Sequence, residues 1–325
     1  MALSIASVLA PHAAALGVAV AIDLAIGDPE YPAHPVRGIG RSLQIIEGWL
    51  RRIGADSYAG GIILFVALAV TWVGVLSGLV LWLASLWSWL GWAAHLFLLY
   101  SFLALGDLLR HGWAIERAVR RGDLQEARKD VSRLVGRDTE PMDGAACRRA
   151  AVESLSENLT DGLTSAVFWY VLGGLPLLIL FKVVSTMDSM VGYKTPAYLR
   201  FGWCGARLDD AMNFVPARLT WLLIAGVAAM LPRCSGRKAL RVGVQQHAVL
   251  PGPNSGWSEA ATAGAIGRRL VGPIWMKGEL VTDLWIGDSR DPPLETQGDY
   301  TTASRLVAAV GLSAAVAGCV ILAVF

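Results

Sequence analysis

Between Glu153 and Arg218 an otherwise apolar chain becomes rich in side chains that can do chemistry. It reads ESLSENLTDG at 153–162 and, after an apolar stretch, STMDSMVGYKTPAYLRFGWCGARLDDAMNFVPARL at 185–219. These carboxylates, asparagines, lysine and arginines lie beside or between apolar segments of membrane-spanning length. A charged group at membrane depth costs about 2.5 kcal/mol or more. We therefore expect the function to reside in this block.

The first group of chemical interest is a row of three carboxylates at a spacing of four residues. On a helix, Glu153, Glu157 and Asp161 fall along one stripe and would repel one another without a cation or a basic partner. Mg²⁺ prefers a few carboxylates together with phosphate oxygens from a substrate, so the stripe can serve as a metal site. The alternative is a solvated helix face whose carboxylates pair with Arg148 and Arg149.

The second group combines a carboxylate and a lysine six residues apart. Asp188 can hold a cation, while Lys194 can neutralise phosphate charge. Tyr193 and Tyr198 lie beside them in the sequence. The alternative is an interfacial ion pair with two tyrosines of the membrane boundary.

A third group contains residues for metal, phosphate or polar-substrate binding, namely Arg207, Asp209, Asp210, Asn213 and Arg218. Asp209 and Asn213 are one helical turn apart, which suits a shared ligand. The alternative is that Asp210 or Asn213 caps a helix that begins at Pro216.

Two loops carry further polar residues. The Pro- and Gly-rich segment 27–41 includes Asp28, His34 and Arg37, and it predicts a rigid loop with His34 as a candidate base. The segment 247–273 contains a Pro-Asn-Ser-Gly-Trp turn followed by small residues, and its candidates are His247, Asn254, Trp257 and Glu259. Tight helix contacts through small residues are the alternative for this second loop.

Composition and missing motifs exclude several classes. The net charge of +2 gives no nucleic-acid footprint. The four cysteines form no CxxC pair, which argues against structural zinc and a disulfide framework. A GxxxxGK[ST] phosphate loop is absent, as are GxSxG and HExxH, so any nucleotide is held without a P-loop.

The elements that must position these residues are membrane helices. The chain has 325 residues and is 54% hydrophobic, with a mean hydropathy of +0.50. We predict an all-α, polytopic bundle with four to six spans in one membrane domain over residues 1–325. Gly173-Gly174 and Pro216 predict one or two broken or re-entrant helices. The candidate spans are 3–26, 62–84, 90–109, 163–185, 215–231 and 304–325.

The distribution of basic residues predicts the orientation. Ten Lys and Arg lie in 110–160 and eight in 232–303, whereas 53–109 has none. The positive-inside rule places the two basic loops in the cytoplasm and both termini outside. The 110–160 insertion is expected to be helical, with a capping box at Asp123–Glu126 and a stop at Gly162.

Taken in order, the motifs resemble the adenosylcobinamide(-phosphate) synthase family of cobalamin biosynthesis. They are GDPxxxxHPVRxxG, SENLTDG, MDSMVGYK, ARxDDxxNxxPARL and PNSGWSEAATAGAIG, and they span residues from about 20 to about 290. One departure is local: Ser258 stands where the family more often has proline. The resemblance implies an integral membrane ligase of the inner membrane with its active site facing the cytoplasm. Its reaction joins adenosylcobyric acid to (R)-1-amino-2-propanol or its O-phosphate, with ATP and Mg²⁺.

The resemblance also suggests roles for the residues. The metal candidates are Glu153, Glu157, Asp161, Asp188, Asp209 and Asp210. The candidates for catalysis are Asp188, Lys194, Glu157 and His34. The candidates for binding substrate or phosphate are Arg37, Asn158, Tyr193, Tyr198, Arg207, Asn213, Arg218, His247, Asn254, Trp257 and Glu259. His34 or His247 would take the proton of the attacking ammonium.

Two other functions stay open at this point. One is a Mg²⁺-dependent membrane transferase acting on a prenyl or alcohol diphosphate, suggested by Asp209-Asp210. The other is a non-catalytic corrinoid-binding transporter or regulator, favoured by broken helices. Whether the amine is phosphorylated, and whether activation gives an acyl phosphate or an acyl adenylate, is left undecided. Association with other membrane enzymes of the pathway is implied by the resemblance alone.

Overall fold

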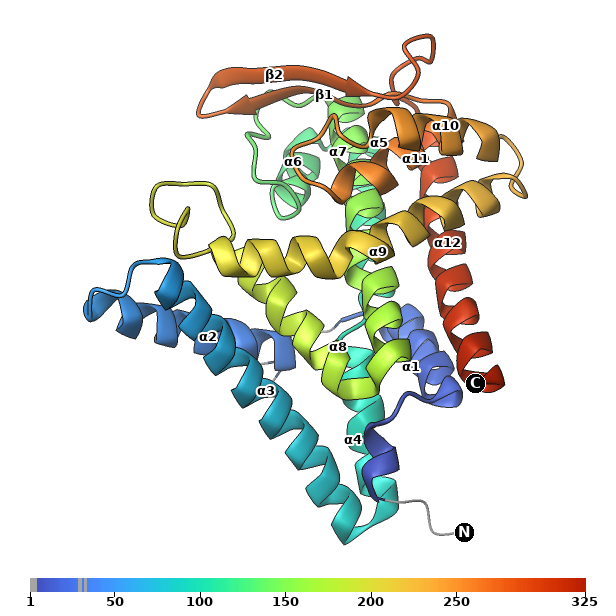
Figure 1. The fold of residues 1–325 in the computed structure, drawn as a ribbon. Coiled ribbons are helices and arrows are strands. Elements are labelled where there is room, and N and C mark those ends of the chain that lie inside the picture. Colours follow the sequence, from blue (N-terminus) through green and yellow to red (C-terminus); the bar gives the residue numbers. More distant parts are fainter. Residues whose placement is uncertain (1–4, 29–30, 32–33) are drawn as a thin grey trace. The chain divides into compact units, whose positions relative to one another are not determined.

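The computed structural model describes residues 5–28, 31 and 34–325, as helices and one β-hairpin (Figure 1). The chain forms two compact units. Unit 1 contains Met1–Ala104, Ser165–Asn213 and Ala315–Phe325, and unit 2 contains Leu105–Thr164 and Phe214–Ala314. Pro29 and Pro32 of the predicted rigid loop lie outside the described residues.

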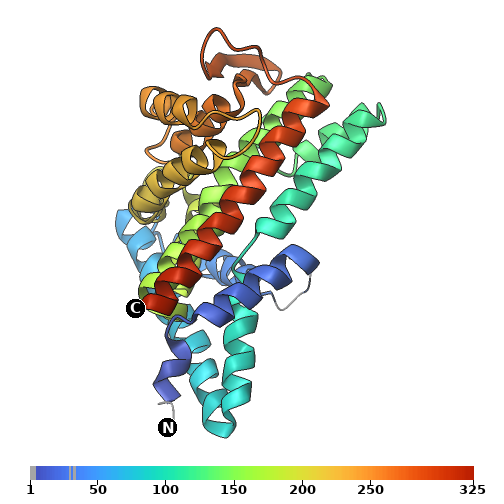
Figure 2. The ribbon, with the colours of Figure 1, turned by 90° about the vertical axis from the view of Figure 1, so that its right-hand side faces the viewer.

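Unit 1 is helical throughout its described part. α3 and α4 form a hairpin that turns at Trp87 (Figure 1). The 3₁₀ turn η1 and α1 contact α4 (Figure 2). Its elements are η1 (Ile5–Leu9), α1 (Ala13–Ile26), α2 (Pro35–Arg52), α3 (Tyr58–Leu86), α4 (Ser88–Ser101), α8 (Ser165–Val191) and the first part of α9 (Trp203–Ala228).

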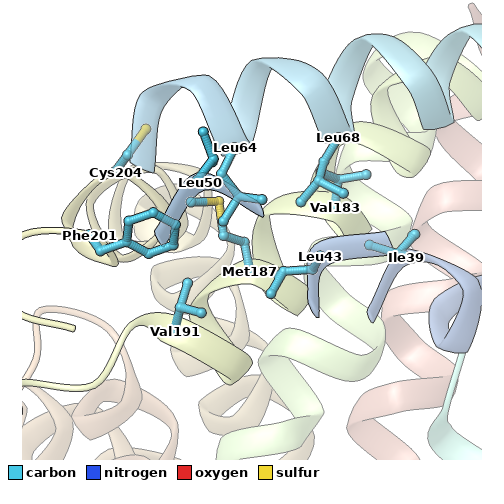
Figure 3. Close-up of a cluster of buried hydrophobic side chains, with 10 residues drawn as sticks. All are labelled: Ile39, Leu43, Leu50, Leu64, Leu68, Val183, Met187, Val191, Phe201 and Cys204. Atoms are coloured by element: carbon cyan, nitrogen blue, oxygen red, sulfur yellow. The ribbon is translucent and has the colours of Figure 1, made fainter. Parts of the chain in front are cut away.

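A cluster of buried side chains joins α2, α3 and α8 (Figure 3). Each helix contributes residues at a spacing of four, such as Leu64 and Leu68 of α3 or Val183 and Met187 of α8, so that one stripe of each faces the others. Lipid tails are as apolar as these side chains, and close packing therefore stabilises the cluster more than exclusion from water does. Phe201 extends the cluster into the α8–α9 connection.

Unit 2 contains three packed helices, a second helix pair and the hairpin. α5 contacts α6 and α7, and α10 contacts α11. The strands pair antiparallel from Leu270↔Ile286 to Met276↔Glu279. The elements are α5 (Leu105–Arg120), α6 (Leu124–Val131), α7 (Gly144–Leu159), the π-helical turn η2 (Thr160–Thr164), α10 (Gly236–Gln246), α11 (Ser255–Ile266), β1 (Leu270–Met276), β2 (Glu279–Ile286) and the first part of α12 (Gln297–Val324).

Five helices in the described part of the chain are long and apolar enough to cross a membrane. They are Tyr58–Leu86, Ser88–Arg120, Gly144–Val191, Trp203–Ala228 and Gln297–Val324. The prediction of a polytopic helical bundle with four to six spans is therefore confirmed. The hairpin is a small addition that the sequence analysis did not predict.

The first predicted span, 3–26, is wrong as a single helix. Its described part is a 3₁₀ turn followed by α1, which has 14 residues. A helix needs about 20 residues to span a bilayer. The third predicted span, 90–109, lies within the candidate span Ser88–Arg120, which has a short irregular stretch where α4 ends at Ser101 and α5 begins at Leu105.

The predicted break in 163–185 is confirmed. Gly173 and Gly174 leave helical geometry inside α8, and Gly174 has a φ of 63°. A Cβ atom at Gly174 would overlap the carbonyl oxygen of Leu9. Both the backbone conformation and the close approach therefore require glycine at this position.

The predicted helix stop at Gly162 is wrong. The π-helical turn η2 carries α7 into α8 without an interruption. A π turn accommodates an extra residue, and Thr164 Oγ1 donates to the Leu159 carbonyl at 3.2 Å. By contrast, Asp123 caps α6, because Glu126 N donates to Asp123 Oδ1 at 3.0 Å. The reciprocal half of the predicted capping box is not formed, since Asp123 N donates to the Ala118 carbonyl at 3.0 Å.

The suggestion that Asp210 or Asn213 caps a helix starting at Pro216 is also wrong. Pro216 lies inside α9. A proline cannot donate to the carbonyl four residues earlier, here that of Met212. The indole Nε1 of Trp169 donates to this carbonyl at 3.2 Å. A side-chain donor thus takes over the missing hydrogen bond, and the helix continues.

The packing of α3 gives a testable prediction. A Cβ atom at Gly61 would overlap the carbonyl oxygen of Phe201, whereas one at Gly74 of the same helix meets nothing within 4 Å. We expect Gly61→Ala to lower the free energy of unfolding by about 1–3 kcal/mol. Gly74→Ala should be neutral or stabilising by up to about 1 kcal/mol. Thermal unfolding in detergent measures both, and equal melting temperatures for the two variants would contradict this packing.

Candidate functional site

A cavity of about 410 Å³ in unit 2 gathers three carboxylates. We call it the acidic cavity. Its walls come from α7, α11, β1 and two loops, and its charged lining residues are Arg137, Glu153, Glu157 and Glu259. Two predicted metal ligands, Glu153 and Glu157, are thus brought together with Glu259, a residue about one hundred positions further along the chain.

Glu153 of α7 connects this helix to the loop that carries Arg137 and to β1. Arg137 Nη2 donates to Glu153 Oε2 at 2.8 Å, and both side chains are nearly buried. The backbone N–H of Val271 donates to Glu153 Oε1 at 3.0 Å. Val271 has a φ of 70°, which is unusual for a β-branched residue. Both oxygens of Glu153 are therefore engaged within the protein.

Glu157 and Glu259 lack such compensation. Neither carboxyl group has a hydrogen bond or ion pair with the residues that the structure describes. Glu259 is only 5% exposed. Its burial raises its pKa well above the ordinary value, and the carboxylates of Glu157 and Glu153 add to the effect. The cavity can accordingly accept a cation or a proton.

Glu157 is exposed, as the alternative of a solvated stripe expects. However, neither carboxylate that α7 contributes to the stripe forms an ion pair with Arg148 or Arg149 in the described part of the chain. Arg148 forms an ion pair with the buried Glu116 at 2.7 Å. Arg149 Nη1 donates to the carbonyl of Leu294 at 3.3 Å.

Unit 1 holds three of the other four predicted metal ligands, which we call the aspartate group. Asp188 lies at the end of α8, and Asp209 and Asp210 lie on α9. The charges of Asp188 and Asp209 interact. Buried Asn213 donates to Asp209 Oδ2 at 2.9 Å and accepts from Ser165 Oγ at 2.5 Å. Asn213 thus orients one of the carboxylates.

Basic and aromatic candidates surround the aspartate group. Arg207 Nη1 lies 3.7 Å from Asp210 Oδ2, and exposed Lys194 interacts with the charge of Asp210. The rings of Tyr193 and Tyr198 lie 6.5 Å apart. Tyr198 also contacts Arg51, whose Cζ is 5.1 Å from the ring centre. The interfacial Asp188–Lys194 ion pair does not occur.

Four binding candidates of unit 2 form an aromatic–arginine stack, defined as Arg218, His247, Asn254 and Trp257. The rings of His247 and Trp257 are stacked with centres 4.0 Å apart. Arg218 Cζ lies 5.0 Å from the Trp257 ring, and its Nη1 is 3.4 Å from Asn254 Oδ1. Because Trp257 is only 9% exposed, a flat ligand would meet His247 and Arg218 before the indole.

The remaining candidates lie elsewhere. His34 caps α2, because its Nδ1 accepts from Val36 N at 3.3 Å, and its Nε2 lies 2.9 Å from Asp28 Oδ1. Arg37 follows on the same helix and is exposed. Asn158 donates to the Ser154 carbonyl at 2.9 Å, and Asp161 lies in η2.

Sequence reasoning missed Arg137 and the backbone of Val271. Arg137 stands in an irregular loop without helical periodicity, so no pattern assigned it a partner. The only available signal was the unbalanced charge of the carboxylate stripe, which required a basic group from another segment.

Comparison with known proteins adds an independent line of evidence. Residues 16–307 match the family model described as CobD/Cbib protein. Cobalamin biosynthesis protein CbiB of Salmonella typhi is 42% identical over 277 residues, which cover 84% of this chain and 86% of that protein. Cobalamin biosynthesis protein CobD of Klebsiella pneumoniae is 42% identical over 276 residues, with the same coverage. No solved structure matches. The chain therefore belongs to the CobD/CbiB family, as its ordered motifs indicated.

Proposed function

We propose that this membrane protein catalyses an ATP-dependent ligation in cobalamin biosynthesis. The reaction joins adenosylcobyric acid to (R)-1-amino-2-propanol or its O-phosphate and gives adenosylcobinamide or its phosphate. Relatives named as cobalamin biosynthesis proteins support the pathway. The observation that carries the reaction class is the acidic cavity, where the carboxyl groups of Glu157 and Glu259 form no hydrogen bond or ion pair with the described residues.

Amide formation needs two preparations that these residues suit. A carboxylate oxygen of the acid must first become a leaving group, by attacking ATP and taking its phosphoryl group with release of ADP, or its adenylyl group with release of diphosphate. The amine arrives as an ammonium ion and must lose a proton before its lone pair attacks the acyl carbon. The leaving phosphate or AMP then departs with the displaced oxygen.

The acidic cavity fits the ammonium ion. Arg137 balances Glu153, which leaves two carboxyl groups for one positive charge. An incoming ammonium would favour the ionised form of Glu259, because opposite charges attract strongly in a buried site. Glu259 has a raised pKa and is therefore a stronger base than an ordinary carboxylate. It would accept the proton as the amine attacks.

The aspartate group fits Mg²⁺ only together with a nucleotide. The described residues contain no set of three His, Cys, Asp or Glu side chains placed to hold a metal ion. Mg²⁺ commonly takes one or two carboxylates and completes its shell with water and phosphate oxygens. Asp188 and Asp209 would supply such a pair, and bound Mg²⁺ would neutralise phosphate charge. Lys194 and Arg207 add positive charge beside them.

The aromatic–arginine stack is the proposed docking surface for the corrinoid. Arg218 and Asn254 can donate to the amide oxygens around its rim. A cytoplasm-facing site in the inner membrane, predicted by the basic loops, would give access to ATP. Contacts with other membrane enzymes of the pathway stay a prediction.

The first prediction concerns the two uncompensated carboxyl groups. We expect Glu259→Gln and Glu157→Gln each to lower amide formation by about 100-fold or more, because a positioned base contributes roughly 10²–10⁴. Glu279→Gln, on the exposed start of β2, removes the same charge outside the cavity and should leave the rate unchanged.

The assay uses protein in detergent with adenosylcobyric acid, ATP, Mg²⁺ and either form of the amine. Chromatography follows the corrinoid product and distinguishes ADP from AMP. Wild-type protein that binds the corrinoid but yields no product with either amine would refute the ligase and leave a binding protein.

The second prediction concerns pH and stability. The folded-state pKa of Glu259 is raised, so the folded protein holds a proton that the unfolded chain releases near pH 4.3. The stability contribution of this group is complete below that pH and falls as the pH rises through the folded pKa. We expect Glu259→Gln to flatten the decline of melting temperature between pH 5 and 8. Parallel curves for variant and wild type would show that Glu259 does not titrate this way.

A further inference from the structure

A second cavity of unit 2, of about 460 Å³, has the opposite character. We call it the basic cavity. It lies between the C-terminal half of α10, the end of β2 and the turn at 287–290, and its polar lining includes Arg241, Gln246, Arg269, Asp288 and Arg290. None of these residues belongs to the site proposed above.

The charges of the basic cavity do not balance. Asp288 is its one carboxylate, against three guanidinium groups. Asp288 Oδ2 accepts from Arg241 Nη2 at 2.6 Å, and its Oδ1 accepts from the Arg290 backbone N–H at 3.1 Å. This backbone bond, with the nearby Arg241, lowers the pKa of Asp288. The Asp288 carboxylate is thus already hydrogen-bonded to Arg241 and to the turn. The lining of the basic cavity therefore keeps a net charge of two positive groups.

Arg269 is held in place, and its two terminal nitrogens have no hydrogen bond to the residues that the structure describes. Its Nε donates to the Asp291 carbonyl at 3.0 Å, and its Cζ lies 4.7 Å from the centre of the Trp285 ring. Arg149 also lies against this indole, at 5.2 Å. The guanidinium groups of Arg149 and Arg269 therefore both lie against the Trp285 ring. The indole supports the arginine rather than offering a surface for a stacked base.

The turn beside Arg290 is fixed from α10. Gln246 Nε2 donates to the Gly287 carbonyl at 3.0 Å, and Gly287 N donates to Gln246 Oε1 at 2.7 Å. This pair of hydrogen bonds holds the turn against the helix that carries Arg241. The arginines consequently converge on one preformed space.

We propose that the basic cavity binds the phosphate group of a phosphorylated small molecule. Planar guanidinium groups bind phosphate oxygens in pairs, and such charge-assisted bonds are the strong ones. The proposed ligation has two sources of this chemistry, the nucleotide and the phosphorylated amine. Only the choice between those two sources rests on the proposed function.

The test measures binding to the purified protein in detergent. The probes are tripolyphosphate, ATP without Mg²⁺ and aminopropanol phosphate. Arg269→Gln and Arg290→Gln should each weaken binding by about tenfold or more, because each removes a charge-assisted hydrogen bond to the phosphate. Arg237→Gln removes an equal charge from the exposed side of α10, outside the cavity, and should have little effect.

Arg290→Gln keeps the test clear of misfolding, because this side chain is exposed and the hydrogen bond of Arg290 to the turn is made by its backbone N–H. The probe whose affinity falls most identifies the source of the phosphate. Equal weakening by Arg237→Gln, or no binding of any probe, would overturn the proposal. A further measurement uses nanodiscs that contain phosphatidylglycerol. The proposal would also be overturned if the arginine variants weakened only the binding of this lipid. Tripolyphosphate binding without amide product would refute the ligase and leave the basic cavity standing.

Discussion

The acidic cavity depends on the ion pair between Glu153 and Arg137. Glu153 reaches the loop that carries Arg137 with one oxygen and the backbone of β1 with the other. Breaking a buried pair leaves an uncompensated charge, which costs about 3–5 kcal/mol. The same break would release the Val271 N–H, whose residue has an unfavourable backbone angle. The pair thereby keeps Glu153 neutralised, and it is this that leaves Glu157 and Glu259 as the reactive surplus.

In unit 1 a neutral amide orients Asp209, whereas Asp210 has the basic side chains of Arg207 and Lys194 beside it. Asp209 is held by the amide of Asn213, which in turn accepts from Ser165. An amide can orient a carboxylate without cancelling its charge. A cation bound together with phosphate could use the carboxylates of the aspartate group. The two units thus differ in how much of their acidity they neutralise internally.

Much of this arrangement could be predicted from the sequence. Apolar lengths predicted the spanning helices, and the Gly173-Gly174 pair predicted the break in α8. One error came from a bond between distant segments, because Trp169 supplies the donor that Pro216 lacks. Another came from a local π turn that carries the chain past Gly162. The first cannot be read from the residues around Pro216, and the second is a rare local geometry that residue propensities do not indicate.

The candidate site was likewise predicted only in part. Spacing placed Glu153 and Glu157 on one helix face, but only the fold adds Glu259 and Arg137. The hairpin was missed because its strands, LVGPIWM and ELVTDLWI, read as part of a basic loop. Yet the hairpin and its flanks contribute to both cavities of unit 2, through Val271 to the acidic one and through Arg269 and Trp285 to the basic one. On α7, Glu153 serves the first and Arg149 supports the Trp285 ring of the second. The hairpin therefore takes part in two cavities of opposite charge within one unit: Val271 and Ile274 of β1 line the acidic cavity, and Trp285 of β2 lines the basic one.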